Sequence, residues 1–137
     1  MEKQFKILIV NDSHALRSML KNTLLHAGFV SFADFVEAQN GSSALHILKR
    51  DTIHMVISDW DMPKMNGLEL LKVMHADENL AKISFIMVSS ISEQEKIVEA
   101  IKAGVDDYIT KPFKPDTFAH HVKDILSARN KHTKHHT

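Results

Sequence analysis

Short apolar runs alternate along the chain with longer stretches in which apolar residues recur every three or four positions. Four of these runs are rich in β-branched and long aliphatic side chains, at residues 5–10, 53–58, 83–88 and 107–110. Buried parallel strands show continuous apolar runs, whereas amphipathic helices show a period near 3.6. The pattern therefore predicts strands separated by helices, and a weaker apolar run at residues 34–38 supplies a fifth strand.

Glycine, serine and proline mark where the predicted helices begin and end. Gly28 and Gly104 follow periodic stretches and predict left-handed helix ends. Ser92, with Glu95 three residues later, predicts a capping box, and Pro115 predicts the first turn of the last helix. Five strand–helix units of this size predict an α/β fold: a doubly wound, flavodoxin-like sheet of five parallel strands in the order 2-1-3-4-5, with helices on both faces.

Length and composition limit the classes of protein to consider. The 137 residues suffice for one domain, which we place at residues 1–129 and follow with a disordered tail at 130–137, where no residue is apolar. The formal net charge of zero gives no reason to expect nucleic-acid binding, and the lack of cysteine excludes disulfides. No apolar run reaches the roughly 18 residues of a membrane helix. We therefore expect a cytoplasmic protein.

Polar side chains follow four of the predicted strands. Asn11 and Asp12 follow the first, Asp59 the third, Ser89 the fourth and Lys111 the fifth. The carboxyl ends of parallel strands meet at one edge of the sheet, and ligands of such folds bind there. Carboxylates, a hydroxyl and an ammonium group at one edge indicate a pocket for a divalent cation and a phosphoryl group.

The stretch Ser-Asp-Trp-Asp-Met-Pro at residues 58–63 resembles the receiver domain of two-component response regulators. The resemblance extends over about residues 5–128, and the single-domain chemotaxis regulators are the most similar members. The spacings from Asp59 to Ser89 and from Ser89 to Lys111 also resemble those of the family. Four matching positions in the same order are far more specific than one aspartate at the end of a strand.

The resemblance implies a role for each of these residues. Asp59 would accept the phosphoryl group as a nucleophile, Lys111 would pair with the phosphoryl oxygens, and the Ser89 hydroxyl would hydrogen-bond another of them. Tyr108 matches the aromatic residue that moves inward when the hydroxyl engages the phosphoryl group. The Lys111–Pro112 bond would be cis, as in the family.

The resemblance also implies a Mg²⁺ ion, held by the carboxylates of Asp12 and Asp59 and the main-chain carbonyl of Asp61. Two residues depart from the family pattern. Asn11 stands where a second acid is usual, so it would lie beside the cation rather than bind it, and Asp61 stands where a neutral residue is common. A third departure, a longer connection near residues 29–35, is expected to lie away from the signalling face.

These features predict a signalling domain that a sensor histidine kinase phosphorylates on Asp59. Apart from self-phosphorylation and autodephosphorylation, no enzyme activity is expected. Output would pass through a protein partner, with the flagellar motor switch as the first candidate and a phosphorelay or another regulatory target as the alternative; a phosphatase is a further possible partner. Two rivals remain: a haloacid-dehalogenase-type phosphohydrolase, suggested by Asp59 and Asp61 at the Asp-x-Asp spacing, and a receiver-like interaction module that is never phosphorylated, suggested by Asn11.

Overall fold

The computed structural model describes residues 4–135, and it describes side chains for residues 4–128. The strands are β1 (Phe5–Val10), β2 (Ala33–Ala38), β3 (Met55–Ser58), β4 (Ser84–Ser89) and β5 (Asp107–Thr110). The helices are α1 (His14–His26), the short 3-10 helix η1 (Phe29–Ser31), α2 (Gly41–Arg50), α3 (Gly67–His75), α4 (Gln94–Ala103) and α5 (Pro115–His135). None of the described helices is long and apolar enough to cross a membrane.

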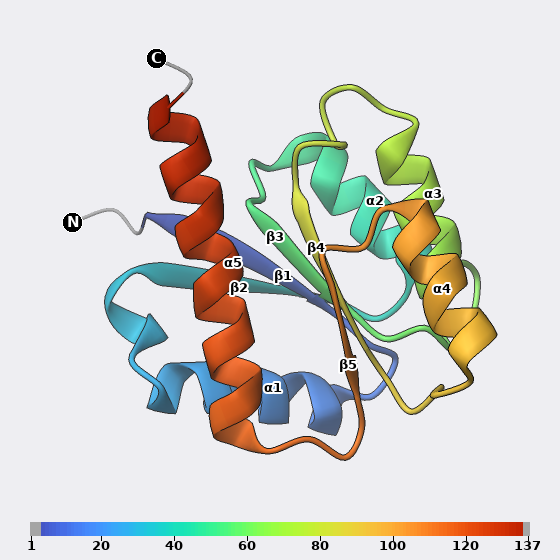
Figure 1. The fold of residues 1–137 in the computed structure, drawn as a ribbon, viewed down its shortest axis with the longest axis horizontal. Helices are drawn as coiled ribbons and strands as arrows, with labels where there is room; N and C mark the ends of the chain where they lie inside the picture. Colours follow the sequence, from blue (N-terminus) through green and yellow to red (C-terminus); the bar gives the residue numbers. More distant parts are fainter. Residues whose placement is uncertain (1–3, 136–137) are drawn as a thin grey trace.

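The five strands form one parallel sheet in the order β2-β1-β3-β4-β5, which confirms the predicted fold class (Figure 1). The register aligns the carboxyl ends of the strands, because Val10 pairs with Ser58 and Ser89 pairs with Thr110. Residues that follow β1, β3, β4 and β5 therefore emerge along one edge. This alignment brings the predicted polar residues to a common place.

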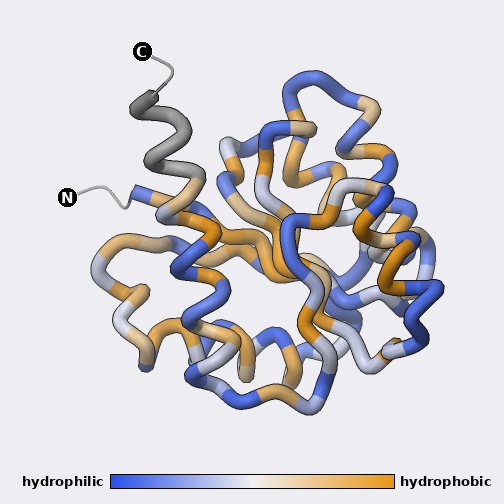
Figure 2. The backbone as a smooth tube through the Cα atoms, in the orientation of Figure 1, coloured by the Kyte–Doolittle hydropathy of each residue, from blue (hydrophilic) through white to orange (hydrophobic). Residues whose placement is uncertain are grey.

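Helices cover both faces of the sheet and give the protein two cores. Leu8 and Val10 of β1 belong to the core under α2, α3 and α4, whereas Ile7 and Ile9 belong to the core under α1 and α5. Side chains alternate between the faces along a strand, so a strand covered on both faces must be apolar throughout. Figure 2 shows the central strands as the most continuously hydrophobic part of the chain.

Several helix ends follow the predictions. Gly28 and Gly104 adopt positive φ angles of 100° and 109°, and Pro115 is the first residue of α5. The predicted capping box at Ser92 is wrong: α4 begins at Gln94, its N-cap is Glu93, and that side chain makes no capping hydrogen bond. The loop after β4 delays the helix by one residue, which leaves Ser92 outside it.

A capping box does occur at the start of α3. The Asn66 side chain accepts a hydrogen bond from the Glu69 N–H at 2.8 Å, and the Glu69 side chain accepts one from the Asn66 N–H at 2.9 Å. Asparagine supplies the same side-chain oxygen as serine, so it satisfies free N–H groups of the first turn equally well. This box fixes where the loop after Asp59 becomes helix.

The last helix is longer than the sequence predicts. α5 continues to His135, past Asn130, where a disordered tail was expected to begin. Residues 130–135 contain neither glycine nor proline, so no helix-breaking residue ends α5 there. Residues 136 and 137 lie outside the described part of the chain, and the domain boundary at 129 stays a prediction.

Candidate functional site

Asp59 follows β3 directly, and its backbone is held close to the neighbouring elements. Its N–H donates to the Val10 carbonyl at 3.0 Å, which continues the ladder between β1 and β3. A Cβ atom on Gly67 would lie 2.2 Å from the Asp59 carbonyl oxygen, so only glycine lets α3 begin so near. The side chain of Asp59 is 14% exposed, which leaves the carboxylate accessible to a small reactant.

Three donors surround the Asp59 carboxylate. Oδ1 accepts the Trp60 N–H at 2.7 Å, while Oδ2 lies 3.4 Å from both Lys111 Nζ and Asn11 Nδ2. Charge-assisted hydrogen bonds are usually about 2.7–2.9 Å long, so the two contacts of Oδ2 are weak. One oxygen is thus fixed by the main chain, and the other is loosely held.

Asn11 acts here as a donor to Asp59. It is 1% exposed, and its Oδ1 accepts the Ser13 N–H at 2.8 Å. That bond assigns the side-chain oxygen to Ser13 and turns the NH₂ group toward Asp59. An aspartate at this position would put a second negative charge beside Asp59, whereas Asn11 adds none.

The structure brings Asp59, Lys111 and Asn11 together, and it places Asp12 and Asp61 in the adjoining loops with exposed side chains. Within the described residues, no three His, Asp or Glu side chains are grouped closely enough to hold a metal ion. A cation at this edge would therefore need main-chain or water oxygens in addition to carboxylates. Mg²⁺ suits such a set, because it binds few protein oxygens and keeps several waters.

Ser89 and Tyr108 share a partner in the loop that follows β4. The buried Ser89 Oγ accepts the Ile91 N–H at 3.0 Å, and the Tyr108 hydroxyl donates to the Ile91 carbonyl at 2.6 Å. The Tyr108 ring also meets the Trp60 ring edge-on, with 6.4 Å between centroids. Tyr108 therefore lies inward, between the loops after β3 and β4.

The environment of Tyr108 raises its pKa above the ordinary value. Burial is the largest cause, and the negative charges of Glu93, Asp59 and Asp61 act in the same direction. The Ser89 side chain acts in the opposite direction.

Lys111 connects the two parts of the site. Its N–H donates to the Ser89 carbonyl at 2.9 Å, and its ammonium group reaches Asp59 Oδ2. The Lys111–Pro112 peptide bond is cis, as the sequence predicted.

Two contributors to this site were not identified from the sequence. Arg17 Nη1 donates to the Asn11 carbonyl at 2.6 Å, and Ile91 binds Ser89 and Tyr108 through its main chain. Ile91 makes its contacts through the main chain, so its residue type could not have predicted them. Arg17 could have been predicted, because an arginine near the acidic loop after the first strand is a candidate partner for that loop.

Comparisons with known proteins agree with this geometry. Residues 7–123 match the model of the response regulator receiver domain. The chemotaxis protein CheY homolog of Campylobacter jejuni is 38% identical over 122 residues, covering 88% of this chain and 92% of the relative. Chemotaxis protein CheY-3 of Vibrio cholerae is 39% identical over 126 residues, covering 92% and 95%.

Solved structures give the same result. A CheY-like response regulator receiver domain protein from Methanospirillum hungatei has a TM-score of 0.84 at 27% identity, covering 95% of this chain and 99% of that one. The signal receiver domain of a signal transduction histidine kinase from Syntrophus aciditrophicus has a TM-score of 0.81 at 33% identity, covering 90% and 91%.

Proposed function

Because this chain belongs to the family of response regulator receiver domains, we propose that it is a signalling switch set by phosphorylation of Asp59. A sensor histidine kinase would be the donor. The observation that carries this proposal is the Asp59 carboxylate itself: it is accessible at the carboxyl edge of the sheet, and the Lys111 ammonium group lies 3.4 Å from its Oδ2.

In the proposed reaction a carboxylate oxygen of Asp59 attacks phosphorus, and the bond between phosphorus and the donor nitrogen breaks. The product is an acyl phosphate. Lys111 would pair with its oxygens, and the Trp60 N–H keeps the carboxylate oriented during attack. Such transfers depend on positioning and on positive charge far more than on covalent help from the protein.

Mg²⁺ belongs to this proposal as the cofactor of the family's phosphorylation site. The residues to hold it are Asp12 and Asp59, through their carboxylates, and Asp61, through its main-chain carbonyl. Bound there, the ion would offset negative charge on the transferring oxygens.

Phosphorylation would act on the surface formed by α4, β5 and α5. It adds about 1.5 to 2 negative charges next to Lys111. A Ser89 hydroxyl that turned to a phosphoryl oxygen would release the Ile91 N–H, and Ile91 also holds Tyr108. On this surface Val98 and Ile101 of α4 are 39% and 57% exposed, so they offer apolar contacts to a partner.

The output we propose is control of the flagellar motor, because the similar curated proteins named above are chemotaxis proteins. A phosphorelay intermediate is the alternative. Binding of a motor-switch protein or a histidine phosphotransfer domain to the beryllofluoride-treated protein would distinguish them. The kinase, any phosphatase and the cytoplasmic location stay predictions.

Phosphorylation is tested by incubating the protein with acetyl phosphate and Mg²⁺ and measuring its intact mass. We expect one added phosphoryl group in the wild type and none in Asp59→Asn, because the amide is a poor nucleophile. A mass shift retained in Asp59→Asn would contradict the assignment of the acceptor.

The same measurement addresses the two rivals. A wild-type protein that never gains the mass would be an unphosphorylated interaction module, the reading that Asn11 favours. Steady turnover of a generic phosphomonoester would indicate a phosphohydrolase, and we expect none.

A further inference from the structure

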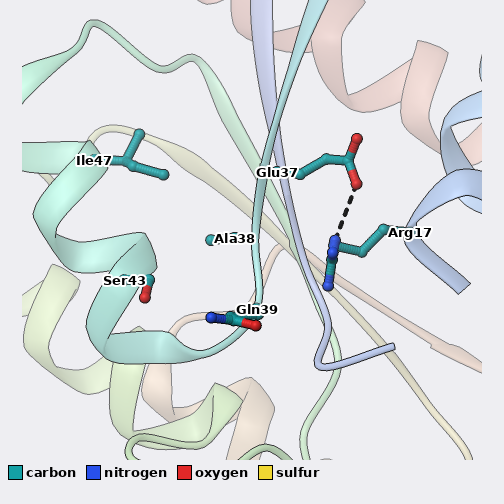
Figure 3. A pocket seen from close by; sticks show the side chains of 6 residues that line it. All are labelled: Arg17, Glu37, Ala38, Gln39, Ser43 and Ile47. Atoms are coloured by element: carbon teal, nitrogen blue, oxygen red, sulfur yellow. Dashed lines mark hydrogen bonds and ion pairs between the residues drawn. The ribbon is translucent and has the colours of Figure 1, made fainter. Parts of the chain in front are cut away.

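Arg17 of α1 lies outside the residues of the proposed chemistry, yet it contacts the segment that carries Asp12. Its Nη1 donates to the Asn11 carbonyl at 2.6 Å, and its Nε donates to Glu37 Oε1 at 2.9 Å. Figure 3 shows the guanidinium group of Arg17 turned toward Glu37 of β2. The Arg17 side chain is only 14% exposed, so these contacts are largely shielded from water.

The contact with Asn11 fixes a peptide group. The Asn11 carbonyl belongs to the planar unit that joins Asn11 to Asp12, so its direction also sets the direction of the Asp12 N–H and the position of its Cα. The rest of Asn11 is held as well: its N–H donates to the Ala38 carbonyl at 3.1 Å, and its Oδ1 accepts the Ser13 N–H. Arg17 completes this set at the point where the chain leaves β1.

Both donors of Arg17 are needed for this geometry. Nε is bound to β2 through Glu37, and Nη1 is bound to the loop after β1 through Asn11. The guanidinium group is a rigid planar fork, whereas a lysine carries one compact ammonium group on a flexible chain. Lysine at position 17 would keep the charge and lose the ability to hold both partners at once.

We propose that Arg17 is a positioning residue for the cation site. Anchored by Glu37, it orients the Asn11–Asp12 peptide, which presets the Asp12 carboxylate for Mg²⁺ and keeps the Asn11 amide directed at Asp59. This inference rests on the proposed function, since Mg²⁺ belongs to it.

The test is a Mg²⁺ titration followed by the fluorescence of Trp60, the one tryptophan of the sequence, which adjoins Asp59. We expect Arg17→Lys to raise the Mg²⁺ dissociation constant about tenfold, as loss of an outer-shell partner commonly does. Glu37→Gln keeps an oxygen that can accept from Nε and loses only the negative charge, so its dissociation constant should rise less than that of Arg17→Lys. Arg50→Lys is the matched control, because the Arg50 side chain is 64% exposed at the end of α2.

A second readout needs no metal. In the metal-free protein, the NMR signals of the Asn11 side-chain amide should shift in Arg17→Lys and remain in place in Arg50→Lys. A loss of stability without a positioning role would lower the unfolding midpoint and leave both the Mg²⁺ constant and the amide signals of the folded protein unchanged. That result would overturn the inference.

Two outcomes separate this inference from the proposed function. If the wild type binds Mg²⁺ and gains no phosphoryl mass, the proposed function fails while the role of Arg17 is still decided by the titration. If the wild type is phosphorylated and Arg17→Lys binds Mg²⁺ equally well, the inference fails alone. Should Arg17→Lys not fold, Glu37→Leu removes the anchor of the guanidinium group and takes its place, with an unchanged Mg²⁺ constant as the contradicting result.

Discussion

At the ends of β1 and β3 the side chains are held around Asp59, whereas at the ends of β4 and β5 they are held around Ile91. We call the first group, Asn11, Asp59 and the Trp60 N–H, the acceptor half of the site. We call the second group, Ser89, Ile91 and Tyr108, the switch half. Lys111 joins them, since its main chain binds Ser89 and its ammonium group approaches Asp59.

The difference separates chemistry from response. The acceptor half contains the proposed nucleophile, and main-chain hydrogen bonds hold the Asp59 backbone and one of its carboxylate oxygens, so we expect it to react with little rearrangement. The switch half contacts a loop through two polar groups that share one residue, and in the proposed function the Ser89 hydroxyl gains a second partner, a phosphoryl oxygen. A two-state response requires such groups with two alternative partners.

The largest effect that would sharpen this comparison is expected from Lys111→Ala. Removing the Lys111 ammonium group should abolish most of the binding of the partner protein. A substantial part of the phosphorylation should remain, because Mg²⁺ would supply most of the positive charge during transfer. Ser89→Ala should also reduce partner binding more than it reduces phosphorylation. Labelling and partner binding are measured on the same samples, with the exposed Lys114→Ala as the control. A full partner response in phosphorylated Lys111→Ala would show that the two halves communicate by another route.

Gly67→Ala is expected to displace the Asp59 main chain in the acceptor half and to destabilise the protein. The new Cβ would lie 2.2 Å from the Asp59 carbonyl oxygen, which is main chain and cannot move aside cheaply. We expect a loss of about 3 kcal/mol in the free energy of unfolding, measured in urea.

Gly28→Ala is the control for Gly67→Ala. At Gly28 an added Cβ meets nothing within 4 Å, and the cost comes from the positive φ of 100° alone. A loss of about 1 kcal/mol is expected there. Equal losses in the two variants would show that the close approach of α3 to Asp59 has little energetic weight.

Asp61→Asn tests whether the acid in the loop after Asp59 affects the lifetime of the phosphoryl group. Its side chain is exposed, so it can repel the phosphoryl group or orient a water molecule for hydrolysis. A well-placed general base contributes roughly 10²-fold or more. We expect the rate of autodephosphorylation to change by several-fold and the Mg²⁺ affinity to change less, with Asp34→Asn on β2 as the control. An unchanged half-life of the phosphoryl group in Asp61→Asn would show that the Asp61 carboxylate has no part in its hydrolysis.

The smallest effect concerns the ionisation of Tyr108 in the switch half. It is the one tyrosine of the sequence, so the absorbance of its phenolate can be titrated directly. Burial raises its pKa above the ordinary 10.0, so the fold favours the protonated form. The resulting stabilisation should be complete below pH 10 and should be lost as the pH rises through the pKa of the folded state. A titration at or below pH 10 in the folded protein would contradict the inward placement of the ring.

Much of this site was predictable because it depends on short-range patterns. An apolar run that ends at a carboxylate locates Asp59, and the parallel alignment implied by the strand–helix alternation brings Ser89 and Lys111 to the same edge. The prediction of a capping box at Ser92 was wrong because the start of α4 depends on the conformation of the loop after β4, and local residue types do not determine that conformation.

The sequence by itself determined the alternation of strands and helices and the polar residues that follow the strands, because periodicity and residue type are local properties of the chain. The strand order and the edge that carries these residues followed from the usual arrangement of such units. Only the tertiary structure decided which way the Asn11 amide faces, which carbonyl Arg17 binds and where Tyr108 rests. Each of these depends on a contact with a segment far along the sequence: Asn11 with Asp59, Tyr108 with Ile91, and Arg17 with Glu37, which directs the guanidinium group. The energy of such hydrogen bonds depends on the distance and angle between donor and acceptor, and these are fixed only when both cores are packed.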